Sequence, residues 1–322
     1  MQANIGMAGE FRCVVKRADG STKIDTGYQK NLILNQGLDF FGKNSGFMTA
    51  YCVVGSGNSA PAYSQNKLDA FLAATETTGY PVYKTDYDKV RDGNLYKASV
   101  TNKYSFTNIV GNICEIGLAS DYSSSTTYNL CTRALIKDSS GNPTTITVLS
   151  GEILDVYYKL WRITDLTDKN TTINVLDGVG GSVPYNVITR PLYIGFNSGA
   201  YDYANKAIGI PAAYRMGATL TIEGDTGELA DANSAFNSVN GSNVSSKTWS
   251  PYVLGSYKRQ LTANATVNDL NLNIRRFQVQ IGFGDFQFRV GRASDDSPLV
   301  KNNTQTLSIP IEISWGRYEG AL

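Results

Sequence analysis

The sequence contains no histidine among its 322 residues. This absence excludes the Ser-His-Asp and Cys-His arrangements that activate nucleophiles, any histidine general base, and imidazole-ligated metal sites. Charge of one sign does not predominate either, because 29 Lys and Arg residues against 28 Asp and Glu residues give a net charge of +1. A surface that neutralises phosphates needs a basic stripe or a basic and aromatic cluster, and none stands out. We therefore expect no nucleic-acid partner.

Long apolar runs are absent as well. No run approaches the ~20 residues that cross a bilayer, so we expect no membrane insertion. Residues 1–7, Met-Gln-Ala-Asn-Ile-Gly-Met, have neither the charged nor the apolar region of a signal peptide, so synthesis in the cytoplasm is expected.

Cysteine is scarce and never occurs as Cys-x-x-Cys. The four residues are Cys13, Cys52, Cys114 and Cys131. Without histidine, a zinc site would need all four thiolates from scattered strands, so we expect buried, reduced cysteines that act as small hydrophobic side chains. A disulfide or a metal site is the alternative.

The patterns that are present are those of β-strands. In residues 277–291, apolar and polar side chains alternate on both sides of Gly284-Asp285, which suits a two-residue turn. This turn predicts three opposed pairs: Phe283 with Phe286, Ile281 with Phe288, and Val279 with Val290. All apolar residues then share one face, so turn and pattern agree.

The same reasoning predicts further hairpins. Asp19-Gly20 favours a turn that opposes Val15 with Ile24, Cys13 with Thr26, and Phe11 with Tyr28. Asp92-Gly93 predicts a third hairpin. Alternation also predicts strands over 154–160 and 307–315, and Pro310 indicates that the latter is an edge strand, at least locally.

Helical signals are few. Apolar spacing predicts short helices over 32–41, over 66–74 with Asn66 as cap, and over 228–236. The chain is therefore predicted to be mainly β, with two antiparallel β-sandwich domains and a few short helices. The polar stretch 164–172 divides them into residues 1–165 and 166–322, and residues 224–246 form a long loop of the kind that makes contacts.

Candidate chemistry is weak. A glycosidase needs two carboxylates about 5–10 Å apart, and sequence spacing does not show such a pair among the acidic residues near strands or loops: Glu115, Glu152, Asp155, Glu223, Asp225, Glu228 and Asp285. The series Asp86, Asp88 and Asp92 offers oxygen ligands for calcium but lacks the closing Glu of an EF-hand, so turn formation explains it better. We predict no catalytic residue, no cofactor and no metal.

A set of short motifs in residues 9–163 carries a resemblance. In order, they are Gly9-Glu-Phe-Arg12, Asn31-Leu-Ile-Leu-Asn-Gln-Gly-Leu38, Cys52-Val-Val-Gly-Ser-Gly-Asn58 with Pro61, Leu68 with Phe71-Leu-Ala-Ala74, Glu115-Ile-Gly117, Arg133-Ala-Leu-Ile-Lys137, Gly141-Asn-Pro-Thr144, Ile146-Thr-Val148, and Glu152-Ile-Leu-Asp-Val-Tyr157. As an ordered set, they resemble a domain of tailed-bacteriophage virion proteins, of the tail or tail-fibre kind.

The resemblance implies a non-enzymatic structural component of the tail, collar, baseplate or fibre-attachment region. It implies other phage virion proteins as partners, and localisation in the virion after synthesis in a bacterial host. We expect a homo-oligomer, a trimer or a ring, because such chains usually assemble symmetrically.

The alternative is a receptor-binding module that recognises host-surface carbohydrate. Four aromatic residues in or near expected loops are the candidates: Tyr201, Tyr203, Trp249 and Tyr252. Their rings could stack on sugars, or they could fill an interface between chains. A concave exposed patch favours sugar binding, whereas burial against another chain favours assembly.

Overall fold

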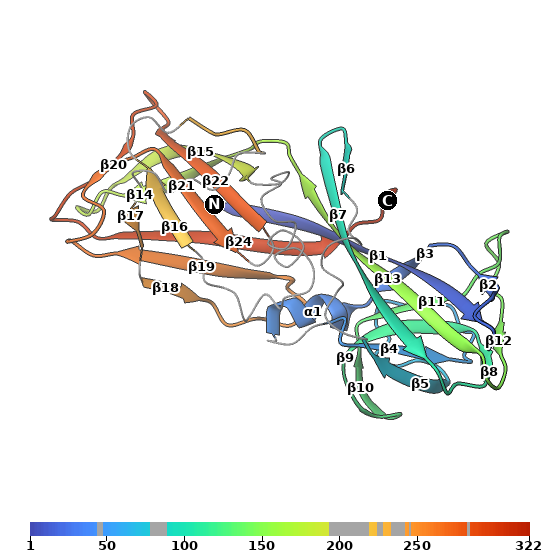
Figure 1. Ribbon diagram of the computed structural model, residues 1–322. Helices are drawn as coiled ribbons and strands as arrows, with labels where there is room; N and C mark the ends of the chain where they lie inside the picture. The colour runs from blue at the N-terminus through green and yellow to red at the C-terminus, as the bar shows by residue number, and fades with distance from the viewer. Residues whose placement is uncertain are drawn as a thin grey trace.

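The computed structural model describes residues 1–43, 48–77, 89–192, 219–223, 228–232, 242–244, 246–281 and 284–322. They form a mainly β protein, as predicted, with one helix, α1 (Asn35–Lys43), within the described residues. Figure 1 shows an elongated molecule, in which early strands gather at one end and late strands at the other, while β1, β7 and β13 run between them. None of the described helical residues forms a span long and apolar enough to cross a membrane.

The largest sheet contains 14 strands and draws on both halves of the chain. Its members are β1 (Gln2–Lys16), β2 (Thr22–Asp25), β3 (Gln29–Ile33), β4 (Tyr51–Gly55), β5 (Phe71–Glu76), β6 (Lys89–Asp92), β7 (Leu95–Phe106), β9 (Glu115–Ser124), β10 (Thr127–Leu130), β11 (Thr132–Leu135), β13 (Ile153–Asp165), β18 (Ser246–Trp249), β19 (Lys258–Ala265) and β24 (Leu307–Arg317). The predicted division into 1–165 and 166–322 stays a prediction, but β24 and β1 join these halves within one sheet.

A second sheet of six strands packs in the late half. It consists of β14 (Lys169–Leu176), β15 (Ser182–Leu192), β16 (Thr219–Glu223), β17 (Ser242–Asn243), β21 (Arg276–Ile281) and β22 (Gly284–Arg292). Two small sheets pair β8 (Gly111–Ile113) with β12 (Ile146–Val148), and β20 (Leu272–Ile274) with β23 (Leu299–Lys301). All pairings among the described strands are antiparallel except that of β1 with β24.

One hydrophobic cluster extends through both ends of the molecule. Its early part includes Phe11 and Val156, and its late part includes Phe288 and Ile311, all fully buried. Burial of such side chains contributes about 1.5–3 kcal/mol each, so this shared core is the main force that holds the strands together.

The long strands are those that the alternating pattern marks most clearly. The strand expected over 154–160 is β13, which pairs with β7 from Leu154 to Asp165 and with β1 from Ile153 to Ile163. The strand expected over 307–315 is β24, and it is an edge only locally: Pro310 pairs with β19 alone, whereas from Glu312 onward the strand also pairs with β1. Pro310 lies before the stretch that pairs with β1, which begins at Glu312, so the missing donor costs no ladder bond there.

The hairpin over 277–291 exists with a different register. Val279 faces Phe286 rather than Val290, because Gly284 and Asp285 belong to β22 and the connection, residues 282–283, lies outside the described residues. The change in pairing is an even number of residues, so the two faces keep their members, as the period of two requires.

The two other hairpins are present. In the first, Val15 faces Ile24 as predicted and Thr26 hydrogen-bonds the backbone of Cys13, but Phe11 faces Gln29 instead of Tyr28. The break between β2 and β3, at residues 26–28, causes this shift, because Val15 and Ile24 on its turn side keep the predicted register. In the third hairpin, β6 and β7 pair up to Asp92 and Leu95, so the turn is formed by residues 93–94.

Of the helices predicted, one is confirmed. Helix α1 begins at Asn35, after β3 has used residues 29–33, and buries Leu38, Phe40 and Phe41. The helix expected over 66–74 is wrong, because Phe71–Glu76 forms β5, paired with β4. The prediction of a helix over 228–236 is wrong for residues 228–232, which are not helical. Residues 233–236 lie outside the described residues.

Candidate functional site

A buried ion pair organises the loop between β4 and β5. Glu115, at the start of β9, and Arg133, in β11, are both fully buried, and Arg133 Nε donates to Glu115 Oε2 at 2.8 Å. Arg133 also donates to Asp69 Oδ2 at 2.7 Å and to Gln65 Oε1 at 2.8 Å. We call the group Gln65, Asp69, Glu115 and Arg133 the polar clasp.

The polar clasp captures backbone groups that no strand satisfies. Glu115 Oε1 accepts hydrogen bonds from the amides of Gly57 at 3.0 Å and Ala70 at 2.9 Å. Glu115 Oε2 accepts from the amide of Asp69 at 3.2 Å. A β-carbon on Gly57 would lie 2.4 Å from Glu115 Oε1, so only glycine allows the carboxylate so close. These amides bind a carboxylate rather than helical carbonyls, which explains why residues 66–74 do not form the predicted helix.

Asp69 links the clasp to the surface. Its Oδ2 accepts from the Ser59 amide at 3.0 Å and from the Ser59 hydroxyl. Partial burial acts to raise the pKa of Asp69, but the hydrogen bonds from Ser59 and the neighbouring Arg133 outweigh it and lower the pKa below 3.8. The carboxylate is therefore charged at neutral pH and committed to structural partners.

Several of the short motifs noted in residues 9–163 meet at this clasp. Residues 52–58, 68–74, 115–117 and 133–137 lie far apart in the sequence, yet they supply the ion pair, the glycine loop and the strands around it. Sequence reasoning placed Glu115, Arg133 and residues 55–58 in separate short motifs, and Glu115 among the candidate acids, but it did not predict that they contact one another. The signal that could have found the clasp is the presence of one Glu and one Arg inside strongly apolar strands, which requires each to have a partner.

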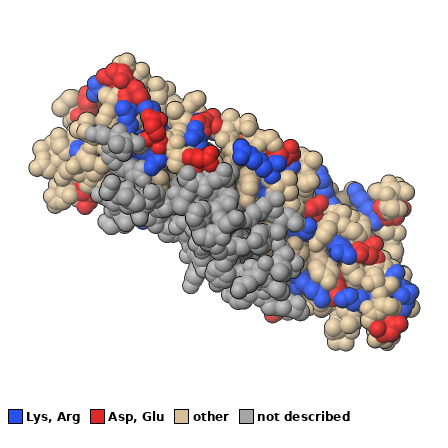
Figure 2. Space-filling view, turned by 45° about the horizontal axis from the view of Figure 1, so that its top comes forward, with Lys and Arg blue, Asp and Glu red and all other residues tan. Residues whose placement is uncertain are grey.

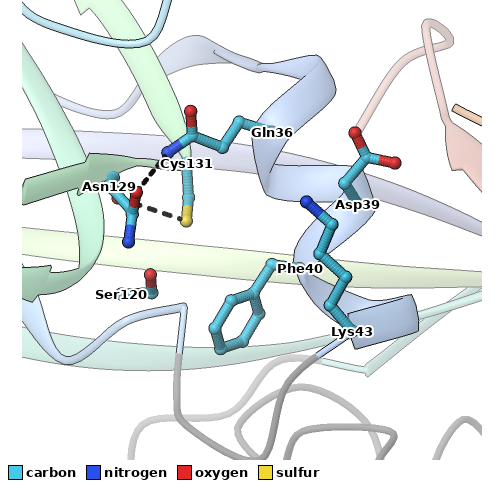
Figure 3. A pocket seen from close by; sticks show the side chains of 7 residues that line it. All are labelled: Gln36, Asp39, Phe40, Lys43, Ser120, Asn129 and Cys131. Carbon is cyan, nitrogen blue, oxygen red and sulfur yellow. Dashed lines mark hydrogen bonds between the residues drawn. The ribbon is translucent and has the colours of Figure 1, made fainter. Parts of the chain in front are cut away.

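A small pocket of about 290 Å³ lies between α1 and the strands β9 and β10. Figure 3 shows the side chains that line it: Gln36, Asp39, Phe40, Lys43, Ser120, Asn129 and Cys131. Gln36 Nε2 donates to Asn129 Oδ1 at 3.1 Å, and burial raises the pKa of the Cys131 thiol to about 12. The thiol is therefore protonated at neutral pH and does not offer a nucleophilic thiolate.

The acidic residues weighed for hydrolysis are also held by neighbours. Asp155 is buried and pairs with Lys16 at 2.9 Å and with Lys103 at 3.1 Å. Glu152 accepts from Lys23 at 2.7 Å and from the Leu149 amide at 2.9 Å.

Among the other candidate acids, Glu228 is exposed and its carboxylate lies 3.7 Å from Arg289 Nε. Asp285 is buried and lies in β22, whereas Asp225 lies outside the described residues, as do Asp86 and Asp88. In the described part of the chain, no three His, Cys, Asp or Glu side chains gather to hold a metal ion.

The aromatic candidates are placed in part. Tyr252 is half-buried: its ring stacks on Trp315 with centroids 5.9 Å apart, and its hydroxyl donates to Asp39 Oδ1 at 2.6 Å. Burial, together with the hydrogen bond to Asp39, raises the pKa of the Tyr252 hydroxyl. Trp249, also half-buried, lies under the Arg259 guanidinium, 5.5 Å from its ring centroid. Tyr201 and Tyr203 lie outside the described residues.

The contacts of Tyr252 are therefore with other residues of the same chain. It joins the loop before β19 to α1 and β24, and a β-carbon on Gly42 would lie 2.2 Å from its ring. A sugar ring could not stack on a face that already packs against Trp315. The structure does not bring Trp249 and Tyr252 into a described sugar-binding patch, and the carbohydrate alternative stays a prediction.

The last residues of the chain cross back over the first half. Arg317 donates to the Ile33 carbonyl at 2.5 Å, Lys30 donates to the Gly320 carbonyl at 2.9 Å, and Lys97 donates to the Ala321 carbonyl at 2.8 Å. Lys97 is itself buried and pairs with Asp92. These contacts fasten residues 317–321 to β3 and β7.

Comparison with known proteins gives no relative. No family model, no curated protein and no solved structure matches the chain. The charged side chains on the described part of the surface in Figure 2 are mixed in sign, which is consistent with the net charge of +1.

Proposed function

We propose that the protein is a non-enzymatic structural component of a tailed-phage particle. In this role it joins or decorates the tail, collar, baseplate or fibre-attachment region through contacts with other virion proteins and with further copies of itself. The observation that carries the proposal is the polar clasp, where short motifs that resemble phage virion proteins meet. Motifs that meet in space form one folded unit, as expected if the resemblance covers a domain rather than scattered matches.

The character of the side chains supports the same proposal. The carboxylates of the polar clasp, of Asp155 and of Glu152 each have structural partners, so they act to hold strands and loops. The absence of histidine leaves few routes to nucleophile activation. Residues committed to internal ion pairs suit a chain that serves as a rigid building block.

Mass spectrometry of purified phage particles tests the proposal. The chain should be present at a fixed copy number relative to the known structural proteins of those particles. Immunogold electron microscopy on the same preparation should place it at one discrete position on the tail or neck. Label at the extreme fibre tips would favour the receptor-binding alternative, and absence of the chain from washed particles would overturn the proposal.

A further inference from the structure

Strand β14 is an open edge of the six-stranded sheet. It pairs with β15 through eight consecutive residues without a bulge, and no described strand pairs with its other side. It contains no proline or glycine, and its only charged residue is Lys169 at the beginning. The unpaired backbone groups of such an edge are a template for another strand.

The other edges of this protein are protected in ways that β14 is not. Every other described strand that pairs on one side only spans six residues or fewer, whereas β14 spans eight. Three of these short edges carry charges inside the strand: Lys23 in β2, Arg91 in β6 and Lys247 in β18. Short length and charge are the devices that prevent edge pairing, so their absence from β14 sets it apart.

The two faces of β14 are also clearly distinguished. Ile173 and Val175 point inward and pack against the core, whereas Thr172 and Asn174 are exposed. Beyond the strand, exposed apolar side chains continue: Leu176 is 81% exposed, and Val179, in the turn to β15, is 90% exposed. No other large hydrophobic side chain in the described residues is as exposed as these two.

We propose that β14 pairs with β14 of a second copy of this chain about a twofold axis, so that two six-stranded sheets become one. Residues opposite each other in an antiparallel pair share a face. In a twofold pairing, the residue numbers of two opposed residues always add up to the same sum, and this sum must be even if both residues are to share a face. A sum of 346 pairs residues 170–176 with residues 176–170 of the second copy. It also places Lys169 opposite Asp177 of the second copy, so opposite charges meet at both ends of the pairing.

This register also matches side chains along the interior. Ile173 faces its own symmetry mate, Thr171 faces Val175 of the second copy, and Thr172 faces Asn174 of the second copy. Pairs of β-branched residues on one face and polar residues on the other are the combinations that stabilise neighbouring strands. The inference depends only on β14 and does not rest on the proposed phage function.

A charge placed on the edge tests the pairing. The double variant Thr172→Lys/Asn174→Lys changes two exposed side chains and sets two lysine pairs against each other across the twofold axis. Its matched control, Gln260→Lys/Ser308→Lys, adds the same charge at exposed positions of β19 and β24. These two strands both pair within the 14-stranded sheet. We expect the dimer dissociation constant, measured by sedimentation equilibrium, to rise at least ~10-fold in the β14 variant and to stay unchanged in the control.

A disulfide trap tests the register. In a mixture of an Asn170→Cys chain and a Leu176→Cys chain, both also carrying Cys114→Ser to remove the partly exposed native thiol, oxidation should link residue 170 of one copy to residue 176 of the other. Neither variant alone should crosslink, because equivalent positions then lie about 20 Å apart, at ~3.4 Å per residue. A monomeric wild-type protein, or a dimer that survives the lysine substitutions, would overturn the proposal. A crosslink that forms as readily in the single variants would overturn the register.

Discussion

Substitution of Glu115 by Gln is the most direct test of the polar clasp. The change keeps the shape of the side chain and removes only its charge and one acceptor. Each oxygen of Glu115 faces two donors, since Gly57 and Ala70 donate to Oε1 while Asp69 and Arg133 donate to Oε2. Whichever way the new amide turns, its NH₂ group meets two donors.

The magnitude follows from burial. Both partners are 0% exposed, and Arg133 would keep only Asp69, which is 31% exposed, as a counter-ion. Breaking a buried ion pair by removal of one charge costs about 3–5 kcal/mol. The exposed pair Arg12–Asp25 is the matched control: its side chains are 37% and 36% exposed, so Asp25→Asn should cost about 0–1 kcal/mol.

Urea unfolding, followed by tryptophan fluorescence, measures both changes in the free energy of unfolding. The double variant Glu115→Gln/Arg133→Met should lose less than the sum of its two single variants, because each single change leaves a buried group without its partner. If Glu115→Gln costs no more than Asp25→Asn, the clasp does not hold the loop and the reasoning is refuted.

Three further predictions concern other parts of the molecule. Gly42→Ala should destabilise the protein by about 1–3 kcal/mol in the same urea assay, because its β-carbon would collide with the Tyr252 ring; Tyr252→Phe, which keeps the ring, is the milder control. Burial acts to raise the pKa of Asp155, but hydrogen bonds from Ser105, Lys16 and Lys103 lower it below 3.8. The stability from Asp155 is therefore present above pH 3.8 and lost as the pH falls through the lower folded pKa, so Asp155→Asn should show a smaller loss of stability in acid. A thiol reagent should label Cys114, the one partly exposed cysteine, and leave Cys13, Cys52 and Cys131 unmodified until denaturation.

Each of these has a contradicting outcome. If Gly42→Ala were as stable as the wild type, the Tyr252 ring would be able to move away from α1 at little cost in free energy. An unchanged acid response in Asp155→Asn would show that other carboxylates dominate it. If the folded Cys114→Ser variant were still labelled, the reagent would be reaching one of the three buried thiols.

The fold class could be predicted from the sequence because alternation is a local signal. It located β13, β24, β21 and β22, and turn residues located the hairpin that pairs Val15 with Ile24. Register was less predictable: the break between β2 and β3 shifts the partner of Phe11 by one residue, and the length of the hairpin connection shifts that of Val279 by four. Only the second shift is even and keeps the predicted faces.

The polar clasp could not be predicted because it depends on contacts between distant residues. Asn66 and the apolar run after it read as a capped helix, but the amides of Asp69 and Ala70 donate to Glu115 instead. A carboxylate 45 residues away in the sequence therefore overrides a local preference. The contacts of Tyr252 could not be predicted for the same reason, because its neighbours Asp39 and Trp315 lie far from it and from each other in the sequence.

The parallel pairing of β1 with β24 has a consequence for biosynthesis. The Asn4 side chain donates to Ser314, 310 residues later, so this ladder cannot form until all the residues between them have left the ribosome. Contacts of such high sequence separation slow folding, and until they form, residues 2–7 of β1 lack β24 as a partner and stay available to other strands. The nascent protein thus passes through a long interval in which its first strand is vulnerable to aggregation. The rate of synthesis and the supply of chaperones should therefore govern its yield more strongly than its final stability does.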